Sequence, residues 1–519
     1  MKVEKISLEK SKGFSQFFLD YKSEKNELKA FYNRPPKIEN YKEQIEDKQF
    51  DQQKRAVLFE SLSIQYQGFT ISKAVNANLE ALMDENTFTI TTGHQLNIFT
   101  GPLYFIYKIV TVINTTLQLK AQYPDYNFVP VYWMASEDHD FDEIKYFNLF
   151  GKKHVWDSDQ KGAVGKFDPK SMSSIIDALP EKNILFEKAY LEHDTLADAC
   201  RYYVNELFGD QGLVIIDGDD KGLKGQFTDV MHDDLFNHHA NDLVEQSSSK
   251  ISELGYKPQV YPRTINFFYL KGNVRARIIK EDNGWSVNNT DLLFSEAELK
   301  EMIQNEPEVF SPNVILRPLY QEQILPNLAY VGGPGELVYW LQLKSTFDYY
   351  KTPFPILMPR NFALVINKSL NKKITKFDFS MEEVFMKKER LLENHIKKNA
   401  DHEISFTSEK ANLQKLFDGI TEQSKLIDGS LQGFIGAEYN KALKSIDTIE
   451  KRLKKSEQSK HEVALNQITA FKEKLFPNGG LQERHDNFLN FYLNNSDFIN
   501  QLYQSLDPFD FSMHVLLDD

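Results

Sequence analysis

The stretch "TTGHQLNIFTGPLYFIYK", residues 91–108, joins a predicted strand to a predicted helix. It overlaps the alternating apolar pattern of "FTITT" (88–92) and continues into an apolar helical run that ends at "KAQY" (120–123). Gly101 and Pro102 mark the transition, and proline suits the first turn of a helix because its missing N–H needs no partner there. Open α/β sheets bind their ligands outside the carboxyl ends of the strands, at joints of this kind.

Two further apolar runs have the same form. "NFVPVYWMA" (127–135) is typical of a buried parallel strand and runs into "SEDHDFDEI" (136–144), and "GLVIIDGDD" (212–220) also ends in acids. The pattern returns at 311–344 and at 353–366. Strands that alternate with helical stretches predict a doubly wound α/β core.

Composition narrows the class of protein. The chain has 519 residues, more than one hydrophobic core organises, so roughly two to four domains are expected. A net charge of −14 argues against a nucleic-acid partner, since such binders neutralise phosphates. The only cysteine, Cys200, excludes an internal disulfide framework and suits a reducing cytoplasm. The sequence shows no signal-peptide core and no apolar run of about 18 residues, so we expect a soluble cytoplasmic protein without a membrane partner.

Shifts in pattern divide the chain into segments. Residues 263–289 read as antiparallel strands that turn at Gly272-Asn273, which indicates an insertion in the α/β core. The predicted segments are the first part of the core with an N-terminal helical stretch (1–150), a core strand and helices with insertions (151–310), the second part of the core (311–377), a helical coiled coil (378–475) and a C-terminal segment that packs back on the core (476–519).

The helical segment 378–475 is rich in lysine, glutamate, leucine and isoleucine. Its apolar residues follow a spacing of three to four on a charged background at Ile446, Ile449, Leu453 and Val463, with interruptions at Ser456 and Lys460. We predict an antiparallel helical hairpin whose two arms are joined near "DGSLQGFIG" (428–436).

The start of the helix after residue 100 predicts an anion seat. Thr100, Gly101 and Pro102 leave free N–H groups at the positive end of the helix dipole, which suits a phosphate or a carboxylate. Tyr104 and Lys108 share one helical face, so the lysine is placed to reach the same anion. The alternative is an ordinary strand–loop–helix joint with a solvated lysine.

Titratable residues follow the second strand without a gap: Glu137, Asp138, His139 and Asp140. Such a group binds a metal, an ammonium or sugar hydroxyls, or acts as a base. A solvated acidic loop is the alternative. His94 and His139 supply no zinc-ligand spacing, so no metal site is predicted.

Further candidates lie in the second half of the chain. "AYVGGPGE" (329–336) has three glycines before a helix but matches neither a P-loop nor a complete G-x-G-x-x-G motif, and a tight turn without a ligand explains it equally. Arg317 either binds an anion or braces its loop. Arg360 in "MPRN" and Arg484 in "LQER" indicate a second pocket or structural salt bridges.

Five motifs carry a resemblance to a known family. In chain order they are "TTGHQLNIFTGPLYFIYK", "VPVYWMASEDHDFDEI", "SPNVILRPLYQEQILPNLAYVGGPGELVYW", "PILMPRN" and "LQER". Together they resemble the BshC family of bacillithiol-biosynthesis proteins over nearly the full chain.

The resemblance implies an α/β fold with a Rossmann-like core, related to nucleotidyltransferases and class I aminoacyl-tRNA synthetases. It also implies inserted connective-peptide regions and an α-helical coiled-coil domain that forms a homodimer. The implied enzyme is a ligase that adds L-cysteine to the amine of glucosaminyl-malate. Its implied cofactor is ATP or ADP, with Mg²⁺ as an optional companion ion, and a second nucleotide pocket lies away from the active site.

With this resemblance, the candidate residues take roles. The predicted catalytic residues are Glu137, Asp138, His139, Asp140 and Lys108. The predicted substrate-binding residues are Gly93, His94, Gln95, Thr100, Gly101, Tyr104, Arg317, Gly332, Gly333, Gly335 and Glu336. The predicted nucleotide pocket uses Arg360, Asn361 and Arg484.

The residue chemistry suits this reaction, because joining a carboxylate to an amine is uphill in water and activation as an acyl-adenylate needs a seat for phosphates. The helix start with Lys108 suits phosphate, the acids suit an ammonium or sugar hydroxyls, and either His139 or Asp138 suits a base. Arg317 suits the malate carboxylates. Two alternatives remain at this point: another nucleotidyl-transfer enzyme on the same core, and a non-catalytic coiled-coil assembly protein.

Overall fold

The structure is a computed structural model that describes residues 1–11, 13–180, 183–399 and 404–518. It divides into two compact units, which we call the core unit (Met1–Ile366 and Leu481–Asp519) and the helical unit (Asn367–Gly480). Residues 481–519 therefore belong to the core unit, whereas the predicted C-terminal segment begins at residue 476. The boundaries of the helical unit differ from the predicted 378–475, because α18 (Lys368–Phe377) belongs to this unit and not to the core.

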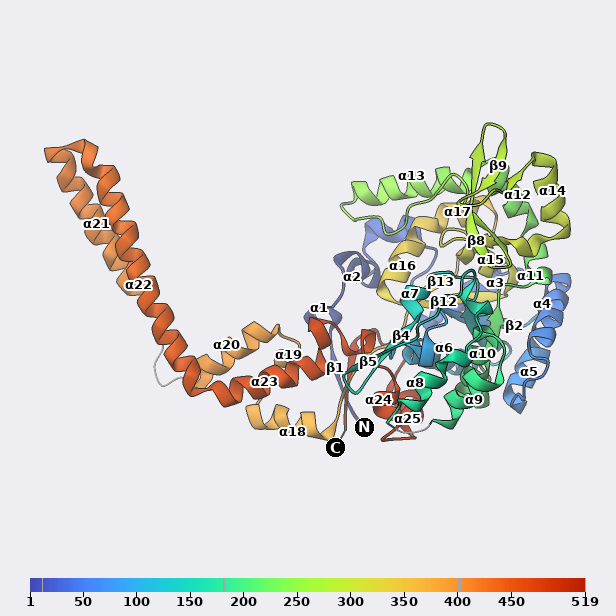
Figure 1. Cartoon of the computed structure of the whole chain (residues 1–519), viewed down its shortest axis with the longest axis horizontal. Coiled ribbons are helices and arrows are strands. Elements are labelled where there is room, and N and C mark those ends of the chain that lie inside the picture. Colours follow the sequence, from blue (N-terminus) through green and yellow to red (C-terminus); the bar gives the residue numbers. More distant parts are fainter. Residues whose placement is uncertain (12, 181–182, 400–403, 519) are drawn as a thin grey trace. The chain divides into compact units, whose positions relative to one another are not determined.

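A five-stranded parallel sheet forms the centre of the core unit (Figure 1). Its strands are β2 (Thr87–His94), β3 (Asn127–Met134), β6 (Val214–Asp217), β12 (Asn327–Gly332) and β13 (Ile356–Pro359). The spatial order is β13-β12-β2-β3-β6, and all four pairings are parallel. Read from β6, the strands come third, second, first, fourth and fifth along the chain, which is the order of a Rossmann-type doubly wound sheet. The predicted fold class is confirmed.

The first strand and the first helix explain why the sequence folds in this way. All residues of β2 are buried, and the hydroxyls of Thr89 and Thr91 donate to Asn327 Oδ1 on β12 over 3.1 and 2.8 Å. Threonine alternation therefore satisfies a buried strand, because each hydroxyl finds an acceptor. Helix α6 (Tyr104–Gln122) connects β2 to β3 and packs against both strands through its apolar side chains.

Helices surround this sheet and carry the connections. In the core unit, the longer helices are α2 (Gln16–Lys22), α3 (Tyr41–Asp47), α4 (Gln52–Gln65), α5 (Lys73–Ala81), α9 (Ile184–Glu192), α10 (Leu196–Phe208), α12 (Thr228–Phe236), α13 (His239–Glu253), α14 (Glu296–Asn305), α15 (Arg317–Ile324), α16 (Pro334–Trp340), α17 (Lys344–Tyr349) and α25 (Phe498–Ser505).

The insertion forms an antiparallel sheet of its own. Its strands are β7 (Phe267–Lys271), β8 (Val274–Glu281), β9 (Gly284–Val287), β10 (Leu293–Phe294) and β11 (Phe310–Pro312), in the order β10-β9-β8-β7-β11. The turn between β7 and β8 is formed by Gly272 and Asn273, where the sequence predicts it.

A third sheet joins distant parts of the chain. β15 (Met513–Leu517) lies between β1 (Lys2–Ile6), to which it is antiparallel, and β14 (Phe362–Ile366), to which it is parallel. The run 353–366 is therefore divided between two sheets, because β13 belongs to the parallel sheet and β14 belongs to the third sheet.

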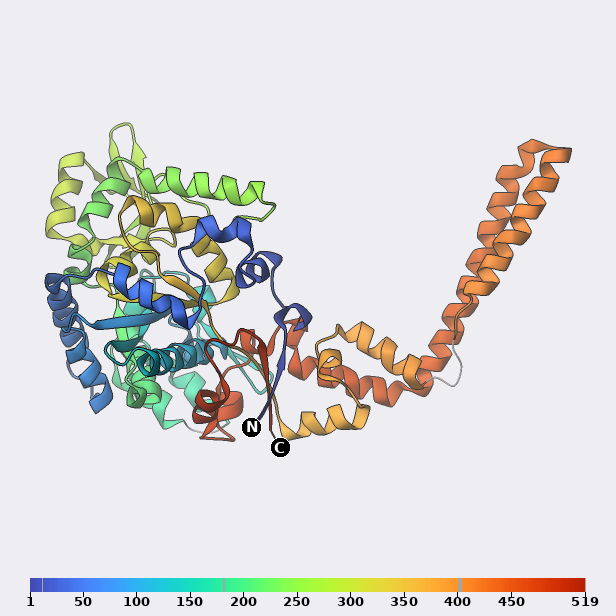
Figure 2. The ribbon, with the colours of Figure 1, turned by 180° about the vertical axis from the view of Figure 1, so that it is seen from behind.

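The helical unit contains α18, α19 (Met381–Val384), α20 (Lys388–Asn399), α21 (Thr407–Ile427), α22 (Gln432–Lys460) and α23 (Glu462–Leu475). Helices α21 and α22 lie side by side as the predicted antiparallel hairpin, drawn in orange in Figures 1 and 2. The arms are joined at residues 428–431, within the predicted stretch. Across the hairpin, Lys410 pairs with Glu450 at 2.5 Å and the rings of Phe417 and Tyr439 lie 5.5 Å apart.

Candidate functional site

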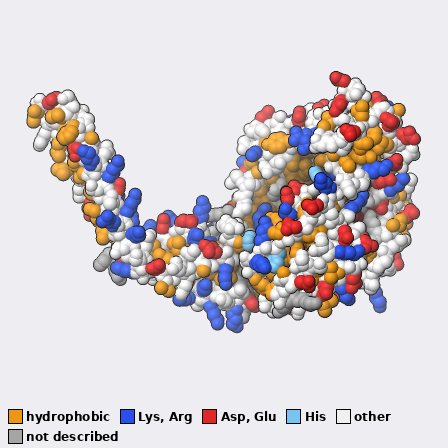
Figure 3. Space-filling view, viewed as in Figure 1, with side chains coloured by type: hydrophobic (Ala, Val, Ile, Leu, Met, Phe, Trp, Pro, Cys, Tyr) orange, Lys and Arg blue, Asp and Glu red, His pale blue; other side chains and the backbone are white. Residues whose placement is uncertain are grey.

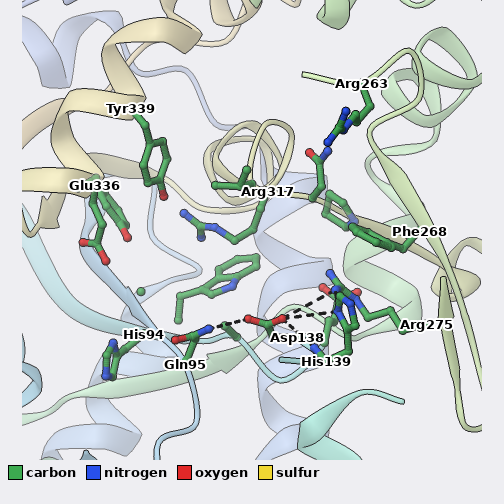
Figure 4. Close-up of a pocket in the computed structure, with 18 of the residues that line it drawn as sticks. His94, Gln95, Asp138, His139, Arg263, Phe268, Arg275, Arg317, Glu336 and Tyr339 are labelled. Atoms are coloured by element: carbon green, nitrogen blue, oxygen red, sulfur yellow. Dashed lines mark hydrogen bonds and ion pairs between the residues drawn. The ribbon is translucent and has the colours of Figure 1, made fainter. Parts of the chain in front are cut away.

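A cavity of about 580 Å³ lies at the carboxyl ends of the parallel strands. Strands β2, β3 and β12 contribute Gly93 with His94, Trp133 and Tyr330 to its wall. The chain leaves β2 toward β3 on one side, and its second half adds β12 on the other side, so the cavity occupies the topological switch point of the sheet. The antiparallel sheet and helices α15 and α16 complete the wall (Figure 4).

Gly93 allows two side chains to approach the end of β2. A Cβ atom at this position would lie 3.2 Å from the Tyr330 hydroxyl oxygen and 3.7 Å from Arg317 Nη1. A methyl group here would press on the Tyr330 hydroxyl and would touch Arg317 at ordinary van der Waals distance. Glycine therefore lets Tyr330 approach the end of β2 closely.

Arg317 has a buried guanidinium nitrogen without a hydrogen-bond partner among the described residues. Its Nη1 donates to Gln321 Oε1 over 3.0 Å, while its Nη2 is buried and finds no hydrogen-bond partner among the described residues. The guanidinium carbon lies 5.7 Å from the ring centroids of both Trp133 and Tyr330. A buried N–H without an acceptor costs free energy, so this geometry favours a ligand with an anionic oxygen.

A buried network holds Arg317 from behind. Gln321 accepts from the guanidinium and donates to Glu322 Oε1 over 2.9 Å. The same Glu322 oxygen accepts from Asn327 over 2.6 Å, and Lys48 Nζ lies 3.7 Å from the other oxygen. These four supporting side chains are all buried, so they fix the orientation of the guanidinium.

Asp138 lies at the opposite wall as an ionised acceptor. It accepts from Gln95 Nε2 over 2.8 Å and from the His139 backbone N–H over 2.7 Å. Burial raises the pKa of Asp138, but the Gln95 hydrogen bond and the charge of Arg275, 3.9 Å away, outweigh it and hold that pKa below the usual value. Asp138 is therefore charged at neutral pH.

His139 is held in one tautomer. Its Nδ1 lies 2.5 Å from Arg275 Nη1 (Figure 4). A guanidinium only donates, so Nδ1 accepts and the ring hydrogen resides on Nε2. Burial and the Arg275 charge lower the pKa of His139, which keeps the ring neutral at pH 7. The side chain thus offers an N–H donor, while its basic nitrogen is already in use.

The other two cavity carboxylates also have cationic partners. Glu137 lies 2.6 Å from Lys224 Nζ, and Glu336 lies 2.5 Å from Lys108 Nζ. Both lysines are buried, and Lys108 also donates to the Gly93 carbonyl over 2.8 Å. Burial lowers the pKa of Lys224, but the charges of Glu137 and Asp219 outweigh it and raise that pKa above its ordinary value. Neither carboxylate is an unpaired negative charge.

The structure brings many predicted residues together. Those that line the cavity are Gly93, His94, Gln95, Tyr104, Glu137, Asp138, His139, Arg317 and Glu336. His94 is neutral, because burial lowers its pKa well below the usual value. The predicted residues that do not line it are Thr100, Gly101, Lys108, Asp140, Gly332, Gly333, Gly335, Arg360, Asn361 and Arg484.

The start of α6 is closed by the C-terminal segment. The Leu103 N–H donates to the Asp486 carbonyl over 2.8 Å, and Asn487 Nδ2 donates to the carbonyls of Phe99 and Gly101 over 2.6 Å each. Thr100 is buried as well. The anion seat predicted here is therefore not formed, and Lys108 serves as an internal brace for Glu336.

Arg360 is also engaged inside the protein. Its Nη1 and Nη2 donate to the two carboxylate oxygens of Glu483 over 3.0 and 2.5 Å, and both side chains are buried. Asn361 donates to the Asp507 carbonyl over 2.6 Å, whereas Arg484 is exposed. At Arg360 the structure shows the salt bridge that was the alternative to a nucleotide pocket.

Three arginines that line the cavity are not among the site residues that the sequence predicts. Arg263, Arg275 and Arg277 line the cavity from the insertion that reads as antiparallel strands. The spacing of Arg275 and Arg277 on one strand predicts that both point to the same face. The spacing of the two arginines can be seen in the sequence. No nearby residue, however, indicates that this face of the strand covers the end of the parallel sheet.

Two features are absent from the described residues. Within the ranges that the structure describes, no group of three or more His, Cys, Asp or Glu side chains is arranged to hold a metal ion. Over the same ranges, no helix combines the length and the apolar character that crossing a bilayer requires.

Comparison with known proteins gives full-length matches. Residues 1–361 match the family model of the BshC N-terminal Rossmann-like domain, and residues 363–517 match that of the BshC C-terminal coiled-coil domain, both described under bacillithiol biosynthesis. A protein of Flavobacterium psychrophilum is 45% identical, with 98% of each chain covered, and one of Cytophaga hutchinsonii is 41% identical, with 99% of this chain and 98% of the relative covered. Both carry the name "Putative cysteine ligase BshC". The chain belongs to the BshC family of bacillithiol-biosynthesis proteins.

Proposed function

We propose that the core unit is an ATP-dependent ligase that joins the carboxylate of L-cysteine to the amine of glucosaminyl-malate. Family membership supports the ligase class, because the relatives are named for cysteine ligation. The position of the cavity at the switch point of a Rossmann-type sheet supports a small-molecule site. We also propose a cytoplasmic location, which a single buried thiol, Cys200, suits.

The observation that carries the substrate assignment is the buried Nη2 of Arg317, which finds no acceptor among the described residues. A malate carboxylate supplies the missing acceptor in the plane of the guanidinium. The rings of Trp133 and Tyr330 flank the same group and exclude water from it. The network through Gln321 and Glu322 keeps the guanidinium in place before the substrate arrives.

The acids at the other wall supply proton transfer. The attacking amine of the sugar must lose a proton as the amide forms, and Asp138 is the ionised acceptor of this wall. His139 offers its Nε2–H as a donor to an oxygen on which negative charge develops. In this assignment Asp138 is the base, and the contact of Arg275 with His139 Nδ1 supports the choice of Asp138 over His139.

ATP, when bound, supplies the free energy for a condensation that is uphill in water. The cavity fits a phosphate-bearing ligand, because Arg263 and Arg277 line it and have no carboxylate within 4.0 Å among the described residues. Arginine is well suited to phosphate, since its donors form a planar fork.

The test is a reaction of the purified protein with glucosaminyl-malate, L-cysteine and ATP–Mg²⁺, followed by mass spectrometry. We expect the condensed thiol only when all three are present, and a loss of product in Arg317→Gln that is partly overcome by raising the glucosaminyl-malate concentration. No condensed thiol from folded wild-type protein in the complete mixture would refute the proposal.

A further inference from the structure

The charges of the cavity wall do not balance one another. Each of its three carboxylates already has a cation: Glu137 has Lys224, Asp138 has Arg275, and Glu336 has Lys108. Four arginines line the same wall, and only Arg275 is used in this way. The wall therefore carries an excess of positive charge, which favours a ligand with several negative charges.

The three unused arginines lie in two environments. Arg317 begins α15, and most of its side chain is enclosed by the aromatic wall. Arg263 and Arg277 are exposed, and the described part of the chain shows no hydrogen bond or ion pair from either guanidinium. They come from the antiparallel insertion: Arg277 lies on β8, and Arg263 lies in the segment before β7.

Strand geometry explains why these side chains face the cavity. Arg275 and Arg277 are two residues apart on β8, so they project from the same face. Arg275 stacks over Phe268 with its guanidinium carbon 4.2 Å from the ring centroid, and both line the cavity. Figure 4 shows Arg263 and Arg275 on the same side of the cavity, across from Glu336 and His94, and Figure 3 shows basic side chains at the edge of an apolar hollow in the core unit.

We propose that Arg263 and Arg277 form a polyphosphate subsite on the solvent side of the cavity, separate from the carboxylate subsite at Arg317. The ligand class is a chain of phosphates, such as the tail of a nucleoside triphosphate. The proposal deepens the proposed function, because the naming of ATP rests on that function, while the binding of phosphates does not.

The two subsites differ in what they can hold. Arg317 has one unfilled Nη2 between two aromatic rings, which suits a single planar carboxylate. Arg263 and Arg277 offer two complete guanidinium forks in an open position, which suits tetrahedral groups that carry several charges. Their exposure also gives the ligand access to water and to counter-ions.

The probe is inorganic tripolyphosphate, titrated into the full-length protein by calorimetry at fixed ionic strength. We expect the double variant Arg263→Ala/Arg277→Ala to weaken binding by about tenfold, or about 1.4 kcal/mol. The control is Lys280→Ala, which also removes a positive charge from β8. Lys280 projects from the opposite face of the strand, where it stacks on Trp285. This control should bind tripolyphosphate like the wild type.

A second arm separates the subsites. Arg317→Gln should leave tripolyphosphate affinity unchanged and should weaken the binding of L-malate. The double variant should weaken the binding of tripolyphosphate and leave the affinity for L-malate unchanged. Absence of tripolyphosphate binding to the wild type, unchanged affinity in the double variant, equal weakening by Lys280→Ala, or an equal effect of Arg317→Gln would each overturn the proposal. Tripolyphosphate binding that follows the expected pattern in a protein without ligase activity would count against the proposed function alone.

Discussion

Lys224 Nζ lies 2.6 Å from Glu137 Oε1, and the lysine side chain has no exposed surface. The same ammonium lies 2.8 Å from Asp219. One buried cation thus pairs with two carboxylates at the end of the parallel sheet, and Asp219 also pairs with Lys166 at 3.1 Å. Glu137 faces the cavity as part of this ion cluster. It is therefore a structural element of the wall and not an open seat for a substrate ammonium.

Removal of this lysine should destabilise the core unit. Lys224→Met leaves Glu137 without its cation and leaves Asp219 with Lys166 alone, and breaking a buried pair costs about 3 kcal/mol. Urea unfolding at pH 7 would measure the loss, with Lys221→Met, an exposed lysine of the same helix, as the control. The difference from wild type should narrow as the pH falls, because protonation removes the uncompensated charges. A constant difference at all pH values would contradict the ion-cluster interpretation.

Asp138→Asn should slow turnover strongly while the cavity keeps its shape. The amide is isosteric with the carboxylate but cannot take the proton of the attacking amine, and general-base roles are worth about 10²–10⁴-fold in rate. The measurement is the bacillithiol level in cells whose own gene is replaced by the variant, at matched protein level. Asp142→Asn is a suitable control, because this exposed neighbouring acid pairs only with Lys145 among the described residues. Normal thiol in Asp138→Asn cells would remove Asp138 from the mechanism.

Lys108→Ala should behave as a packing defect and not as a simple loss of ligand affinity. The lysine is buried and connects Glu336 to the Gly93 carbonyl, so its loss leaves both acceptors without their donor. We expect a lower melting temperature and a lower kcat, in contrast to the pure rise in KM that a ligand-binding lysine would give. A variant with wild-type stability and a raised KM alone would restore the role in anion binding.

The acid at the end of β6 should make stability depend on pH. Burial raises the pKa of Asp217 to about 6, so the native state holds a proton that the unfolded chain releases at lower pH. The stabilisation is full below the unfolded pKa of about 4 and is lost as the pH rises through about 6. Asp217→Asn keeps an acceptor for the Ser136 hydroxyl and should be more stable than wild type by about 1–2 kcal/mol at pH 8. Equal pH profiles of wild type and variant would exclude this group as the cause.

The hairpin of the helical unit should hold two copies of the chain together. Ile449 is 52% exposed and Leu453 is 45% exposed, so the seam predicted on α22 is not consumed within one chain. Replacing both with lysine should yield monomers in light scattering, because apolar seams of this kind drive coiled-coil association. Lys451→Ala on the same helix serves as the control. A dimer that survives the double substitution would place the interface elsewhere.

Local pattern predicts the strands, their connecting helices and the helical hairpin, because each is encoded by periodicity within one short window. The first wall of the cavity follows from them, since Gly93, Asp138 and His139 come directly after or at the end of β2 and β3. Parallel strands end at the same edge, so their following residues must meet.

The rest of the site depends on contacts between distant segments. Arg277 reaches the cavity only because the antiparallel sheet covers the strand ends, and Asn487 closes the start of α6 from 386 residues further along the chain. The strands β13 and β14 are both fully buried, so their composition does not reveal that they enter different sheets. No local signal specifies any of these relationships.

The central place of β15 in its sheet sets an order of events during translation. Both of its neighbours, β1 and β14, are synthesised before the helical unit, whereas β15 follows it. The emerging chain therefore carries two unpaired strand edges while the ribosome translates residues 367–480, and such edges invite association with other chains. The helices of that stretch are built from local contacts and form quickly. The time during which β1 and β14 lack their partner strand is therefore set by the rate of translation and not by the rate of folding. Slow codons within the helical unit would consequently lengthen the time at risk, and synonymous substitutions there should change the yield of folded protein without altering one residue.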